Sequence, residues 1–447
     1  MENKRFAARQ RGQIIIMVAL TMTVLIGIAG LSIDTGRAYG VKARLNAAVD
    51  AAAIAGARAL VTGADDGTRV SNASAAATRF FHANYPDGFQ MSTVTEPVVT
   101  AVRDAATNAW TVTVSSQANM PTTFMQVLGQ DHATVAATGQ TIRRDVDVLM
   151  VLDTSGSLGP PTSPATTFPT LQDAALTGFV NKFIPGPGGD RLGLVAFASG
   201  AVTGPAIDKT ASRGFNKTNV TTAINALSVG GSTAGVEGMR QAWNELNAVP
   251  PGVRSPLRVI LYFSDGAPND VGATFPVGGG TVAGNLYSET TGPASATATR
   301  VFRNDTRNSL LGSYAISSLP LSGNDNIPLA SYNGRRTLTG APYDNNRCNV
   351  NKAARNMLEN IANTARSNNV VIYTIGLGTQ LQTLEVGFCG YDFAEYGENI
   401  LKRLANARGV DTYNAAQQTG LYCHADQASE LQQCFSTIAS EILRLSM

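Results

Sequence analysis

The segment DVDVLMVLDTSGS, residues 145–157, decides the fold of this chain. The strand expected over Asp147–Leu152 is short and almost wholly apolar, as in strands that are covered on both faces of a sheet. Asp153, Ser155 and Ser157 follow at its carboxyl end, where open α/β sheets place their ligand sites. The segment therefore predicts a buried strand that brings three oxygen-bearing side chains to one sheet edge.

The rest of the C-terminal part repeats the alternation of strand and helix. Continuous apolar strands interspersed with helices predict an α/β domain with a mainly parallel, doubly wound sheet. The expected strands are Arg191–Ala198, Leu257–Phe263 and Val370–Ile375, and the expected helices are Leu171–Ile184, Val220–Leu227, Thr233–Leu246, Lys352–Arg366 and Ala428–Leu443.

Two further segments bring oxygen atoms to the same predicted edge. VGGSTAGVEGM (229–239) places Thr233 on a glycine-rich turn, and RVILYFSDGAPND (258–270) places Asp265 after another buried strand. Carboxylate and hydroxyl oxygens are hard ligands of the kind that Mg²⁺ prefers. Ser232 is the alternative to Thr233. A purely structural role is the other interpretation, because Ser and Thr often cap helices and Asp-Gly often forms turns.

Residues 267–347 do not fit the alternation. They are rich in Gly, Ser, Thr and Asn, and their periodicity is weak. A loop of this length is usually functional or disordered, so it is either a functional insertion or a tolerated flexible excursion. Because it begins directly after Asp265, we hypothesise that it sets partner specificity. The corresponding expectation is that partner binding does not survive intact when Val271–Tyr343 is deleted.

The three oxygen-bearing segments, together with RLGLVAFAS, VVIYTIGLG and the closing helix, resemble the von Willebrand factor A (vWA) domain and its metal-ion-dependent adhesion site. The resemblance covers 145–447 apart from the insertion. It implies Mg²⁺, or another divalent cation such as Mn²⁺ or Ca²⁺, held by hydroxyls and by carboxylates acting partly through water. It also implies an acidic side chain of a protein partner at the open coordination position, and a mobile final helix. The implied ligands are Asp153, Ser155, Ser157, Thr233 and Asp265.

The N-terminus carries a second landmark. Lys4, Arg5, Arg9 and Arg11 precede an uncharged run, Ile14–Ile33, which as a helix spans roughly 30 Å, the thickness of a bilayer core. The basic cluster predicts a cytoplasmic N-terminus and export of the remainder. A cleaved signal peptide is the alternative, but its apolar region is normally shorter. Residues 1–33 are therefore interpreted as a basic tip and membrane anchor.

We expect a small α+β region over residues 34–143 and the vWA domain over residues 144–447. The helix of the anchor is expected to continue over Asp34–Leu60. The other expected elements are helices at Ser74–Ala83 and Pro121–Leu128 and strands at Ser92–Val102, Trp110–Val114 and Ala133–Ile142, with a turn near Ala106–Asn108.

The stretch 11–60, with Asp34–Arg37 and DAAAIAGA, and MPTTFMQVLGQDHATVAATGQ (120–140) resemble TadG-type proteins of Tad/Flp pilus assembly. The resemblance implies a turn out of the membrane at Asp34–Arg37. It also implies an inner-membrane protein of bacteria with periplasmic or extracellular domains that acts in pilus assembly or adhesion. Related pilins are cleaved before a segment whose fifth residue is Glu. Here Gly12 would precede the cut and the fifth residue is Met17, so the anchor is expected to remain.

Composition and motifs narrow the function classes. The net charge of +2 gives no argument for a nucleic-acid partner. Neither a nucleophile elbow, a catalytic triad pattern nor a phosphate loop is present, so no enzyme is expected. Two other functions stay open, a metal-dependent surface receptor or adhesin unrelated to pili and a metal-dependent hydrolase. The even cysteine count fits two disulfides in an exported protein, with three possible pairings of Cys348, Cys389, Cys423 and Cys434.

Overall fold

A computed structural model describes residues 7–60, 65–104, 109–288, 295–330, 332–340, 342–385 and 395–446. These residues form two compact units, the first ending at Arg143 and the second beginning at Arg144. The turn expected near Ala106–Asn108 and the cysteine at position 389 lie outside the described residues.

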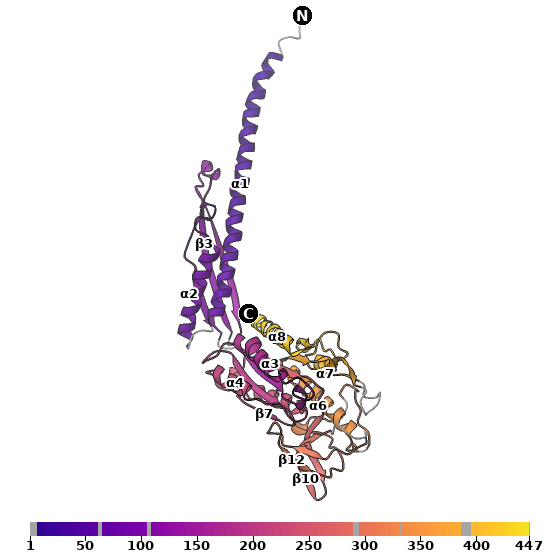
Figure 1. Cartoon of the computed structure of the whole chain (residues 1–447). Helices are drawn as coiled ribbons and strands as arrows, with labels where there is room; N and C mark the ends of the chain where they lie inside the picture. The colour runs from indigo at the N-terminus through magenta and orange to yellow at the C-terminus, as the bar shows by residue number, and fades with distance from the viewer. Residues whose placement is uncertain are drawn as a thin grey trace. The chain divides into compact units, whose positions relative to one another are not determined.

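The first unit is organised by one long helix, α1, which runs unbroken from Ala7 to Ala59. Its part over Ile14–Ile33 exposes apolar side chains almost throughout and is long and apolar enough to cross a membrane. Its C-terminal part buries a stripe that includes Val41, Leu45 and Ala52. Figure 1 shows the N-terminal part of α1 extending beyond the rest of this unit. One helix therefore serves as candidate membrane span and as core element.

The turn expected at Asp34–Arg37 is wrong, because these residues lie inside α1. Their side chains instead hold a distant loop. The buried carboxylate of Asp34 accepts hydrogen bonds from the backbone N–H groups of Thr123, Phe124 and Met125 at 2.8–2.9 Å. The Arg37 guanidinium donates to the hydroxyl of Thr123 at 2.9 Å. The motif is thus a clamp between α1 and this loop rather than a point at which the helix ends.

The rest of the first unit packs on α1. Helix α2 (Asp66–Asn84) and an antiparallel sheet enclose a core around Phe81, Trp110 and Val112. The helix expected at Pro121–Leu128 is only a 3₁₀ turn, η3 (Met125–Leu128), because the preceding strand extends to Pro121. The strands are β1 (Thr93–Val94), β2 (Val98–Arg103), β3 (Trp110–Pro121) and β4 (His132–Arg143), with β3 paired to the other three.

The second unit is built on a six-stranded sheet in the order β16-β13-β8-β5-β6-β7. All neighbouring pairs are parallel except β6 with β7. The doubly wound, mainly parallel α/β fold predicted from the sequence is confirmed. The strands are β5 (Val146–Asp153), β6 (Arg191–Phe197), β7 (Ala201–Thr203), β8 (Leu257–Ser264), β13 (Val370–Leu377) and β16 (Tyr422–Ala425).

Helices cover both faces of this sheet (Figure 1). One face packs on α5 (Gly235–Asn247), α6 (Arg347–Ser367) and α7 (Gly397–Leu404), and the other on α3 (Thr167–Ala174), α4 (Lys217–Asn225) and α8 (Leu431–Leu445). The helix expected over 171–184 becomes a π turn after Ala174, then a 3₁₀ turn. At Gly178 the chain lies so close to α8 that a Cβ would be 2.9 Å from the Gln432 carbonyl oxygen.

The segment expected as an insertion is a folded part of the second unit. Strands β9 (Asp270–Val277), β10 (Gly280–Tyr287), β11 (Arg300–Phe302) and β12 (Leu310–Ser313) form an antiparallel sheet. Val271, Ala273 and Phe275 are fully buried in the same core as α5 and α6. For the described residues the flexible alternative is therefore wrong. Deletion of Val271–Tyr343 would remove core side chains, so it cannot test partner specificity alone.

One disulfide pairing is resolved. Cys423 and Cys434 are bonded, with their Cα atoms 5.6 Å apart, and they link β16 to α8. Cys348 is disulfide-bonded as well. The bond at Cys423–Cys434 fastens the final helix to the sheet.

Candidate metal site

Four of the five predicted ligands are joined by a chain of hydrogen bonds. Asp153 ends β5, and its Oδ1 accepts from the Ser155 N–H at 2.8 Å. The Ser155 and Ser157 hydroxyl oxygens are 3.0 Å apart. The Ser157 hydroxyl in turn donates to Oδ1 of Asp265 at 2.9 Å, across to the end of β8. Adjacent parallel strands thus bring the two sequence segments together at one edge, as predicted.

Ser264, which the sequence pattern did not single out, provides a further hydrogen-bond partner of Asp153. The hydroxyl of Ser264 donates to Asp153 Oδ2 at 2.6 Å and accepts from the Gly266 N–H at 3.2 Å. It therefore orients the first carboxylate and shapes the loop that carries Asp265. Its position after the run Val259–Phe263 and directly before Asp265 was the signal that could have identified it.

Thr233 lies on a loop that borders the other ligands but forms no hydrogen bond with them. Backbone bonds from Gly230 N–H to Thr154 O (2.9 Å) and from Gly156 N–H to Gly231 O (3.1 Å) join the two loops. The Thr233 N–H donates to the Asn269 side chain at 2.9 Å. Within the described residues its hydroxyl has no hydrogen-bond partner, whereas the Ser232 hydroxyl binds Ser199 and Asp270. This arrangement favours Thr233 over Ser232 as the ligand.

The electrostatics of the site call for a cation. Burial raises the pKa of Asp153 against the opposing hydrogen bonds from Ser264 and Ser155. Burial and the neighbouring Asp153 charge raise the pKa of Asp265. Throughout the described residues neither carboxylate forms an ion pair with a basic side chain. Two neighbouring carboxylates in a poorly solvated site repel each other unless a proton or a metal ion neutralises one of them. Carboxylates and hydroxyls together suit a hard divalent ion, so the residues present fit the metal.

The segment 303–309 lies at the edge of this site, although it follows Thr233 by about 70 residues in the sequence. The Arg307 guanidinium donates to the carbonyl oxygen of Ser228 at 2.6 Å and to the Thr154 hydroxyl at 3.4 Å. The Asn308 side chain accepts from the Ser199 hydroxyl at 3.1 Å. Partial burial lowers the pKa of Arg307, yet the group keeps its charge at neutral pH. A permanent cation therefore lies beside the candidate site, and nothing in the sequence pattern marks it.

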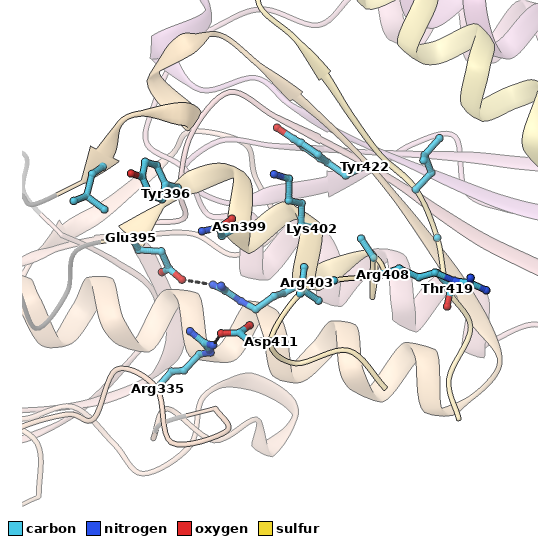
Figure 2. A pocket seen from close by; sticks show the side chains of 16 residues that line it. Arg335, Glu395, Tyr396, Asn399, Lys402, Arg403, Arg408, Asp411, Thr419 and Tyr422 are labelled. Carbon is cyan, nitrogen blue, oxygen red and sulfur yellow. Dashed lines mark hydrogen bonds and ion pairs between the residues drawn. The ribbon is translucent and has the colours of Figure 1, made fainter. Parts of the chain in front are cut away.

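A separate cavity lies elsewhere in the second unit. It encloses about 940 Å³ and is lined by residues of α7 and by Arg335, Arg408, Tyr396 and Tyr422, but by none of the five predicted ligands. Figure 2 shows Glu395 beside Arg403, and Arg335 beside Asp411, along its wall. The cavity borders a buried network in which Arg336 and Arg403 both donate to Glu359, at 2.7 and 2.8 Å.

This network predicts a defined acid sensitivity. Burial would raise the pKa of Glu395, but the charges of Arg336, Arg403 and Arg355 outweigh it and lower the pKa to about 2 from an ordinary 4.5. Because the folded-state pKa is depressed, the stabilisation is complete above about pH 4.5 and is lost as pH falls toward 2. We expect Glu395→Gln to lower the free energy of unfolding by about 3 kcal/mol at pH 7 and by much less near pH 2.

Denaturant unfolding of both proteins across this pH range is the measurement. Glu398→Gln is the matched control, because Glu398 lies on α7 but forms only a partly exposed ion pair, with Lys402. Such pairs contribute roughly 0.3–0.5 kcal/mol. A Glu395→Gln effect as small as the control, or one that does not change with pH, would contradict the assignment.

Comparisons with known proteins agree with this architecture. Residues 12–59 match the family of Flp pilus-assembly TadE/G-like proteins, and residues 148–267 match the von Willebrand factor type A domain family. No curated protein matches the chain.

Several solved structures are similar to the chain at low identity. The vWF domain of the type V pili tip protein Mfa5 from Porphyromonas gingivalis is 16% identical, with a TM-score of 0.40, over 69% of this chain and 98% of that one. The pilus adhesin SpaC from Lactobacillus rhamnosus GG is 15% identical, with a TM-score of 0.38, over 78% and 34%. A point mutant of the PilB minor pilin from Streptococcus sanguinis is 12% identical, with a TM-score of 0.38, over 78% of both chains. This chain therefore combines an N-terminal TadE/G-like segment with a von Willebrand factor A domain.

Proposed function

We propose that this protein is an anchored component of Tad/Flp pilus assembly or pilus-mediated adhesion, and that it binds a protein partner through a divalent cation. The cation, Mg²⁺ in the first instance, would be held by Asp153, Ser155, Ser157, Thr233 and Asp265. The function is binding, without catalysis. The part of helix α1 over Ile14–Ile33 would lie in the inner membrane of a bacterium, with the N-terminus in the cytoplasm and the residues after this span on the other side.

The single observation that carries the proposal is the hydrogen-bonded chain from Asp153 to Asp265. It places the buried carboxylate of Asp153, the partly buried carboxylate of Asp265 and two hydroxyls at one sheet edge, and no basic side chain in the described structure pairs with either carboxylate. A metal ion bound there would supply positive charge and a coordination position for an oxygen atom of the partner. The described residues contain no cluster of three or more His, Cys, Asp or Glu side chains that could hold a metal ion. The proposed site is of a different kind, because it combines carboxylates with hydroxyls.

The neighbourhood of the site supports an acidic partner. Arg307 adds a second positive charge beside the loops that carry the ligands. Charge complementarity of this kind accelerates encounter and selects against cationic partners. We therefore propose that a carboxylate of the partner approaches the metal with Arg307 at its side.

Genetic complementation tests the proposal. A strain that lacks the gene is expected to lose piliation or surface attachment, and the wild-type gene is expected to restore it. Asp265→Ala is expected to reach the membrane in normal amount but to leave attachment defective. Asp173→Ala, which changes an exposed carboxylate on α3, is the control and should restore attachment fully.

The outcomes separate the two parts of the proposal. Unchanged piliation and attachment in the deletion strain would contradict the pilus role. Full restoration by Asp265→Ala would contradict the metal site while leaving the pilus role standing.

A further inference from the structure

The loop between β3 and β4 presents apolar side chains at the level where α1 changes from exposed to buried. Val127 is 84% exposed and Phe124 is 38% exposed. No charged residue occurs from Pro121 to Gln130. Exposed apolar side chains on the charge-free part of this loop, which ends before Asp131, need an explanation when they lie together. The structure gives one, because this loop is attached to the candidate membrane span.

The attachment fixes the height of the loop along α1. The three backbone hydrogen bonds to Asp34 hold residues 123–125 one residue beyond the apolar run Ile14–Ile33. Phe124 reaches still further along the helix, to Gly30, where a Cβ would lie only 2.6 Å from the Phe124 side chain. Gly30 therefore allows the ring to lie directly against α1, inside the apolar run.

The position of Phe124 can be expressed as a depth. Gly30 precedes Ile33 by three residues, so the contact lies roughly 5 Å inside the end of the apolar run, at 1.5 Å of rise per residue. Apolar groups of interfacial membrane proteins are buried to roughly 5–10 Å around the boundary of headgroups and acyl chains. Arg37, one turn beyond Asp34, lies where a basic side chain meets lipid headgroups. The loop is thus at the depth at which a bilayer would cover it.

We propose that the loop over residues 123–128 inserts into the outer surface of the same bilayer that α1 crosses, as a second membrane contact of the first unit. The occupant of this apolar surface is lipid, because the apolar side chains of the loop lie beside the exposed apolar surface of α1, and the charge of Asp34 at their junction is buried under three backbone hydrogen bonds. The proposal rests on the proposed membrane anchoring of α1. With two contacts, the first unit would be held at a fixed tilt to the membrane instead of turning freely on a single helix.

Site-specific fluorescence in liposomes tests this proposal. The full-length chain would carry a single added cysteine, labelled with the environment-sensitive dye NBD, in vesicles of phosphatidylethanolamine and phosphatidylglycerol. No free cysteine is found among the described residues to compete for the label. Val127→Cys is the test position. Leu25→Cys, 65% exposed within the apolar run, reports the anchor itself.

Val102→Cys is the matched control, because Val102 is 63% exposed. It pairs with Thr111, at the opposite end of β3 from Pro121, roughly 30 Å away at 3.3 Å per residue. We expect NBD at Val127 to show blue-shifted emission and to be quenched by lipids with a nitroxide near the headgroup. At Leu25 it should be quenched most by a nitroxide deep in the acyl chain, and at Val102 only by aqueous iodide.

Each outcome decides a different point. If Leu25 is quenched by lipid but Val127 behaves like Val102, the loop does not enter the bilayer and the inference is overturned, even if a protein partner covers the loop in cells. If Leu25 itself is not quenched by lipid, the anchoring is wrong and the inference falls with it. Thermal melting of each labelled protein confirms that the added cysteine leaves the fold intact.

Discussion

Asp153→Ala is expected to abolish the rise in melting temperature that Mg²⁺ produces in the wild-type chain. A ligand that binds only the folded state stabilises it by about 2.7 kcal/mol at one hundred times its dissociation constant. For the roughly 300 residues of the second unit this corresponds to about 4 °C. Asp153 is fully buried and is linked to the Ser155–Ser157–Asp265 chain, so its loss removes one carboxylate and disorders the others.

The metal-free proteins should behave in the opposite way. With EDTA present, the wild-type protein keeps the two neighbouring carboxylates without a cation, and their repulsion destabilises the folded state. Asp153→Ala relieves this repulsion, so the variant should melt at least as high as the wild type in EDTA. Differential scanning fluorimetry with and without Mg²⁺ measures both effects, with Asp173→Ala as the exposed control. An undiminished Mg²⁺ response in Asp153→Ala would refute the site.

The sheet and the shape of the site were predictable because both depend on local patterns. The apolar runs before Asp153 and Asp265 are short, continuous and followed at once by a polar residue. Such runs become neighbouring parallel strands whose carboxyl ends share an edge. Four of the five proposed ligands are accordingly joined by hydrogen bonds. The choice of Thr233 over Ser232 could not be made from the sequence. Only the tertiary hydrogen bonds of the Ser232 hydroxyl with Ser199 and Asp270 distinguish the two residues.

Long-range contacts account for what the sequence left out. The pairing of Arg307 with Ser228 joins positions 79 residues apart, and the binding of Asp34 to the loop at Thr123 joins positions 89 residues apart. Neither contact leaves a periodic signal. The Asp34–Arg37 motif was therefore interpreted as a turn. Its polar side chains are nevertheless compatible with a continuing helix, because backbone N–H groups of a distant loop bind the Asp34 carboxylate. A sequence motif can indicate that a residue is structurally constrained, but only the contacts of that residue in the folded chain show which residues constrain it.

Phe275→Ala is expected to lower the free energy of unfolding of the second unit by about 3–5 kcal/mol, as removal of a buried aromatic side chain usually does. The reason is that Phe275, on β9, is fully buried in the core that α5 and α6 share with the central sheet. If the segment after Asp265 were an appended excursion, truncation of one of its side chains would change stability by less than about 0.5 kcal/mol. The size of the effect therefore distinguishes a core element from an insertion.

Urea unfolding followed by the fluorescence of Trp243 measures this effect, because Trp243 lies on α5 and packs against the same core. Trp110, in the first unit, is replaced by Phe in all proteins so that the signal reports the second unit alone. Leu321→Ala is the control, since Leu321 lies in the same segment but is 66% exposed. Equal stability of the two variants would show that the segment is not part of the core. A large loss confined to Phe275→Ala would mean that the loops beside the metal site, including Arg307, are held by the core itself. Partner specificity must then be tested by single substitutions at that edge, and Arg307→Gln is the first of them.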